Sequence, residues 1–200
     1  MFKMLLLAGP LALLLILPPD ALRFELMRAA RSEHHSAGRL LGWRLFGTTP
    51  IATLLALGIW HWAHSGPLGL PLIVFTGALT AATLWMLFWM RTFIADPLHP
   101  LRPIGFVSVT LASWLSIPLW LSAFTQLALM IAWMSEVRPV VLLTGALVWV
   151  LVDAFVVVAG GESGLGQRFI QLEAAQRRVG RWLGSVLLVL AVWAVVLSLG

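Results

Sequence analysis

The chain of 200 residues contains no cysteine, no asparagine and no tyrosine. Without cysteine it cannot form a disulfide bond, use a thiol in catalysis or bind a metal through sulfur. It also has no His-Glu-x-x-His motif and no cluster of acidic residues that would hold a metal ion. These absences argue against an enzyme, and we expect no catalytic residue, no metal and no cofactor.

Charged residues are scarce as well. Only 10% of the residues are charged and 60% are hydrophobic, whereas about a quarter of the residues in a soluble domain are charged. The composition predicts an all-α polytopic membrane protein whose partner is the lipid bilayer. The net charge of +5 does not indicate nucleic-acid binding, because the basic residues lie between the apolar stretches, where the positive-inside rule concentrates them.

Six apolar stretches are expected to be transmembrane helices, and they cover residues 4–17, 40–62, 68–90, 104–134, 139–161 and 182–199. We expect the first to be retained rather than cleaved as a signal peptide, because Pro18-Pro19 would make a poor cleavage site. The proline-rich linker 94–103 divides this single transmembrane domain into two three-helix halves, 1–93 and 104–200.

The arginines predict the orientation in the membrane. The segments 20–39, 91–103 and 162–181 contain ten arginines, whereas the opposite side has Lys3 and Arg138. By the positive-inside rule these segments face the cytoplasm, so both termini face the periplasm of a bacterial inner membrane. Segment 20–39 also has an amphipathic pattern, in which Arg23 is assigned to the polar face and Leu26 to the apolar face.

One acid interrupts the most apolar stretch. Asp153 lies within 139–161, where a carboxylate costs a few kcal/mol unless it faces the protein interior or a wet cavity. Arg44 and Asp153 each lie about 7–10 Å from the cytoplasmic end of their helices, and this shared depth predicts that they are partners. Two alternatives stay open: Arg44 extends to the headgroups, or Asp153 is a lone acid that carries a proton.

The fourth stretch is longer than one span needs and has Ser113, Ser116 and Pro118 in its middle. A proline frees backbone groups that serine side chains can satisfy, so we expect a break or a kink near Pro118. In the first half, Pro18-Pro19 interrupts the corresponding helix, and paired interruptions point to a transporter site facing one central cavity. The candidate substrate-binding residues are Pro18, Pro19, Asp20, Thr48, Ser113, Ser116, Pro118 and Asp153.

This layout resembles the lysine-exporter family of amino-acid efflux proteins over nearly the whole chain. Pro18-Pro19-Asp20 is similar to the family's Pro-Gly-Pro-Asp turn without its glycine, and Ala37-Gly38, Gly42 and Gly47 match its spaced glycines loosely. The run from Arg177 to Gly184 is similar to the basic segment before the family's last helix. The family's Asn-Pro-Lys motif in span four has no counterpart here.

The resemblance implies two inverted three-helix halves and export of small amino acids or related metabolites as the small-molecule substrate. The missing Asn-Pro-Lys motif favours an alternative, a non-transporting scaffold or partner subunit that keeps the exporter fold. Intramembrane charges are costly to keep without a use, and Arg44 and Asp153 therefore favour the exporter. The substrate, the coupling ion and the oligomeric state, for which a homodimer is one possibility, stay open.

Overall fold

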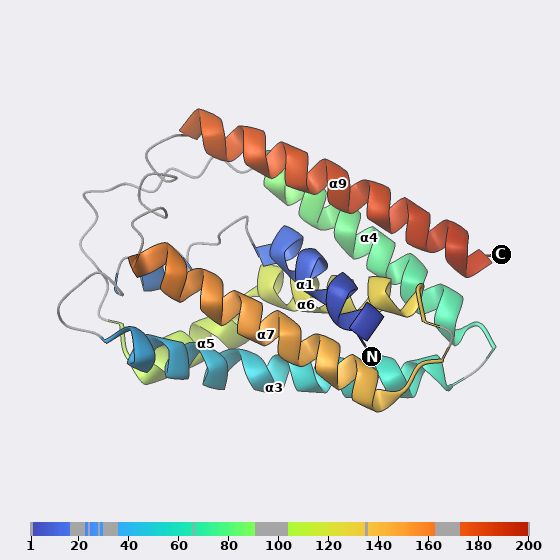
Figure 1. Ribbon diagram of the computed structural model, residues 1–200, viewed down its shortest axis with the longest axis horizontal. Helices are drawn as coiled ribbons and strands as arrows, with labels where there is room; N and C mark the ends of the chain where they lie inside the picture. Colours follow the sequence, from blue (N-terminus) through green and yellow to red (C-terminus); the bar gives the residue numbers. More distant parts are fainter. Residues whose placement is uncertain are drawn as a thin grey trace.

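The computed structural model describes residues 2–16, 23, 25–27, 29, 36–65, 67–90, 104–134, 136–162 and 173–199. Within these ranges the chain is helical and has no β-strand, which confirms the all-α class. The helices are α1 (Phe2–Ile16), α3 (Ala37–Ala63), α4 (Gly69–Met90), α5 (Phe106–Leu115), α6 (Ile117–Ile131), α7 (Pro139–Glu162) and α9 (Glu173–Leu199) (Figure 1).

Four of the described helices, α3, α4, α7 and α9, are long and apolar enough to cross a membrane. The bent pair α5–α6 makes a fifth if it is counted as one span. Helix α1 has 15 residues, fewer than the roughly 20 that a bilayer crossing needs. The described part of the chain therefore has the helices of a multi-pass membrane protein, with four or five candidate spans.

The outer surface of these helices is apolar. On α9 alone, Val189, Val192, Trp193 and Val196 are each more than half exposed. Soluble monomers rarely expose continuous apolar surface on this scale, whereas a bilayer covers it without cost. The lipid bilayer is therefore the solvent that this surface fits.

The helices form three layers (Figure 1). Helix α4 packs against α9 on one side, α3 packs against α5 and α7 on the other, and α1 and α6 lie between them. The colours show that α3 runs antiparallel to α7 and that α4 runs antiparallel to α9. Both termini lie at the end of the molecule where α3 turns into α4 and α6 turns into α7.

The fourth apolar stretch is broken rather than bent as one continuous helix. Ser116 is extended, with φ −78° and ψ 95°, and α5 and α6 meet there at 61°. Pro118 occupies the first turn of α6, where a helix does not need the N–H that proline lacks. The carbonyl of Trp114, four residues before Pro118, accepts a hydrogen bond from Trp120 Nε1 at 2.8 Å instead. An indole, not the expected serine, thus satisfies the backbone group that the proline frees.

Candidate functional site

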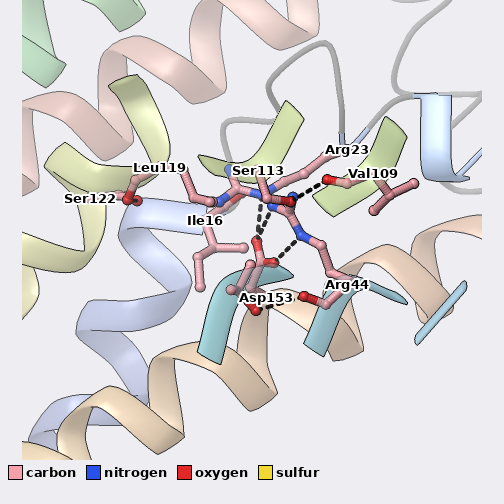
Figure 2. Close-up of polar contacts among 9 residues, drawn as sticks. Ile16, Arg23, Arg44, Val109, Ser113, Leu119, Ser122 and Asp153 are labelled. Carbon is pink, nitrogen blue, oxygen red and sulfur yellow. Dashed lines mark hydrogen bonds and ion pairs between the residues drawn. The ribbon is translucent and has the colours of Figure 1, made fainter. Parts of the chain in front are cut away.

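The buried acid of α7 is engaged by two arginines. Asp153 has no exposed surface. Its Oδ2 accepts a hydrogen bond from Arg44 Nε at 2.5 Å, and its Oδ1 accepts from Arg44 Nη2 at 3.1 Å and from Arg23 Nε at 2.7 Å (Figure 2). We call these three residues the Arg23–Asp153–Arg44 cluster. Charge-assisted bonds of this kind are among the strongest polar contacts in proteins.

Arg44 comes from α3 and is completely buried. Besides Asp153 it reaches α5, because its Nη1 donates to Ser113 Oγ at 3.1 Å. Ser113 Oγ in turn donates to the carbonyl of Val109 at 2.8 Å. Gly47, one turn further along α3, makes this contact possible, since a Cβ there would lie 2.9 Å from Ser113 Oγ. A side chain at Gly47 would push α5 away from Arg44.

Arg23 joins the cluster to the end of α1. Its side chain is 3% exposed, and its Nη1 donates to the carbonyl of Ile16, the last residue of α1, at 3.3 Å. The C-terminal carbonyls of a helix carry partial negative charge, so a guanidinium is a favourable partner there. Arg23 therefore bridges two acceptors, the Asp153 carboxylate and the α1 terminus.

The Arg44–Asp153 contact is the pairing that their shared depth predicts. Arg44 does not extend to the headgroups in this structure, because none of its surface is exposed. Removing two charges from water is costly, and close contact with further hydrogen bonds is what offsets that cost. In the state observed here, Asp153 is a hydrogen-bonded member of an ion cluster rather than a lone acid.

The other predicted site residues lie at different places. Thr48 is buried one turn from Arg44, and its hydroxyl donates to the carbonyl of Arg44 at 2.8 Å, so it bonds its own helix. Ser116 sits at the α5–α6 break, where its carbonyl accepts from Leu119 N at 3.0 Å. Pro118 follows it in α6. The predicted residues Pro18, Pro19 and Asp20 lie outside the described residues.

Sequence reasoning missed Arg23 as a site residue, because it assigned Arg23 to a polar face. In the structure Arg23 is buried together with Leu26 and Ala29. These positions are three residues apart and therefore share one side of a helix. The three-residue spacing between Arg23 and Leu26 thus indicated that both lie on the buried side. Arg23 was nevertheless assigned to the polar face because it is an arginine.

Among the described residues, no three His, Asp or Glu side chains are grouped as a metal ion would require. Comparisons with protein-family models, curated protein sequences and solved structures find no match to this chain. The resemblance to the amino-acid exporters therefore depends on the sequence features given above, and the function has to be argued from the site.

Proposed function

We propose that the chain is a transporter of the bacterial inner membrane that exports small amino acids or related metabolites. The observation that carries the proposal is the position of the Arg23–Asp153–Arg44 cluster. It lies inside the helix bundle and contacts the carbonyl of Ile16 and the hydroxyl of Ser113, three residues before the α5–α6 break. Interrupted helices that meet buried charges are a recurrent design of transporter sites.

The chemistry of the cluster suits a zwitterion. A guanidinium binds a carboxylate through two parallel hydrogen bonds, and in the observed state Arg44 makes such contacts to Asp153. In this proposal the cargo's carboxylate replaces Asp153 on Arg44, and the released Asp153 accepts the cargo's ammonium. Each charge then exchanges one partner for another, so no ion is left alone in the membrane interior.

The helix arrangement supports the exporter-like architecture of six helices in two inverted halves. The second helices of the halves, α3 and α7, pack against each other, and so do the third helices, α4 and α9. Both pairs are antiparallel (Figure 1), as inverted halves require. Within this proposal α1 is a short first span that ends inside the bilayer, and both termini face the periplasm.

The test is uptake of radiolabelled amino acids by proteoliposomes that contain the purified chain. We expect saturable uptake of at least one member of a panel of small amino acids, and a loss of at least tenfold in Asp153→Asn and Arg44→Lys. Glu136→Gln is the matched control, because the Glu136–Arg138 ion pair is solvent-exposed. Folded protein that transports no member of the panel would overturn the proposal.

One observation favours the alternative, a non-transporting scaffold. Both oxygens of Asp153 are already hydrogen-bonded within the protein, as in a purely structural ion cluster. A scaffold would show no saturable uptake of any amino acid in the panel, in the wild-type chain or in Glu136→Gln. Loss of uptake in Asp153→Asn, with unchanged uptake in Glu136→Gln, would exclude this alternative.

A further inference from the structure

The buried face of α7 that carries Asp153 also carries Gly145 and Trp149. Gly145, Trp149 and Asp153 are spaced by four residues, so they form one stripe along the helix, and all three are buried. The stripe runs from the Arg23–Asp153–Arg44 cluster towards Pro139, at the end of the molecule where the termini lie (Figure 1). It therefore connects the interior of the bundle with that end.

Gln126 of α6 packs onto this stripe. It has no exposed surface, and its Nε2 donates to the carbonyl of Gly145 at 3.1 Å. A carbonyl accepts hydrogen bonds and cannot donate them, so this contact fixes which end of the amide faces α7. The amide oxygen, Gln126 Oε1, points elsewhere and has no hydrogen-bond partner among the described residues.

Trp149 presents the complementary group. Its side chain is 1% exposed, and its indole Nε1 is buried without a hydrogen-bond partner in the described part of the chain. The facing helices thus bury one donor and one acceptor that are not paired with each other. Native proteins satisfy nearly all buried polar groups with protein or ordered water, so two unsatisfied groups of opposite kind indicate an occupant.

The directions of the two helices indicate where the two groups lie along them. Trp149 lies one turn beyond Gly145, about 6 Å along α7. Side chains on a helix lean towards its N-terminus, so the Trp149 ring leans back towards Gly145. Helix α6 runs antiparallel to α7 (Figure 1), and Gln126 consequently leans towards Trp149. These directions place the Trp149 indole and the Gln126 amide along the same length of the α6–α7 contact.

We propose that Gln126 and Trp149 form a second polar binding position, between α6 and α7, that holds one hydroxyl group. A hydroxyl oxygen accepts the Trp149 N–H and donates its own hydrogen to Gln126 Oε1. An ammonium cannot accept and a carboxylate cannot donate, so neither satisfies both groups. The hydroxyl belongs to a water molecule or to a small solute such as an amino acid with a hydroxyl side chain. This inference does not depend on the proposed transport function.

The experiment is NMR on the full chain in lipid nanodiscs with ¹⁵N-labelled tryptophan indoles. The Trp149 resonance is identified as the one that disappears in Trp149→Phe. We expect magnetisation transfer from long-lived water to the Trp149 indole proton, and loss of that transfer in Gln126→Leu, which removes the acceptor. Addition of L-serine and, as the matched control, L-alanine then identifies the source of the hydroxyl.

Each outcome decides the proposal. Transfer from water that neither amino acid changes identifies the occupant as water. A shift of the Trp149 resonance with L-serine but not with L-alanine identifies a solute hydroxyl. If the wild-type protein shows neither water transfer to the Trp149 indole nor a response to L-serine, the proposal is overturned. This test needs no variant at Gln126, so it holds even if Gln126→Leu fails to fold.

Discussion

Replacing Asp153 by alanine is the most informative perturbation of the cluster. The change removes three hydrogen bonds from Arg23 and Arg44 and leaves two guanidinium groups facing each other inside the bundle. Breaking a buried ion pair by removing one partner costs about 3–5 kcal/mol, because the other charge stays buried. Asp153→Ala is therefore expected to destabilise the protein by at least this amount.

Arg44→Ala is expected to cost less than Asp153→Ala. Without Arg44, Asp153 keeps its contact with Arg23 at 2.7 Å, so the remaining pair is neutral. In the double variant Arg44→Ala/Asp153→Ala the repulsion between arginines is absent, and Arg23 loses its contact with Asp153. The double variant should therefore be more stable than the sum of the single losses predicts, by about 1–3 kcal/mol, which is the usual coupling of residues in contact.

The assay is thermal unfolding of purified protein in detergent, followed by loss of the monodisperse peak in size exclusion. For a chain of this length, a loss of about 3–5 kcal/mol lowers Tm by about 6–20 °C. Glu136→Gln is the control and should leave Tm unchanged, because exposed ion pairs contribute little. Strictly additive losses in the single and double variants would refute the reasoning and leave Asp153 as an independent acid.

Three further predictions test other parts of the fold. Gly47→Val should destabilise the protein by about 1–3 kcal/mol, because a Cβ there meets Ser113 Oγ at 2.9 Å. Gly58→Val is the control and should change Tm little, because a Cβ at Gly58 meets no atom within 4 Å. Equal effects of the two variants would contradict the α3–α5 contact. Trp120→Phe should cost about 1 kcal/mol, since it leaves the Trp114 carbonyl without its indole donor, and an unchanged Tm would show that this bond is dispensable. Single cysteines placed in the three arginine-rich segments, at Ser32, His99 and Ser163, should react only with reagents on the cytoplasmic side. Labelling of any two of them from the periplasm would overturn the orientation.

The sequence predicts the helices well because long apolar stretches are a local signal. Each expected stretch overlaps a described helix, although 104–134 is divided at Ser116 and α9 begins at Glu173, before the expected start at 182. The charge pair followed from another simple quantity, the depth of Arg44 and Asp153 in their helices. The residue type did not show which glycine of α3 allows a close approach: a Cβ at Gly38 or Gly42 would meet nothing within 4 Å, whereas a Cβ at Gly47 would meet Ser113 Oγ at 2.9 Å.

The buried side of α7 is not visible in its sequence. In a soluble helix, polar residues mark the exposed face, but the exposed face of α7 is apolar as well. Positions such as Leu147 and Phe155 are more than half exposed, whereas Trp149 is 1% exposed, and all three are apolar. Asp153 is the residue that marks the inner face, so the identity of its neighbours could not be predicted from residue type.

Arg23 shows a second reason why part of the site escaped prediction. Its contact with Asp153 joins residues 130 positions apart, and no local pattern encodes such a distance. Residue type was misleading in addition, because an arginine beside a membrane helix usually faces the headgroups. The carbonyl of Ile16, at the end of a short helix, accepts a hydrogen bond from Arg23. The Arg44–Asp153 pair without Arg23 would not supply that donor. Ile16 is buried, and a buried helix end needs donors for its last carbonyls, so the short first helix, rather than the acid, is the feature from which a buried cation in the following segment should be inferred.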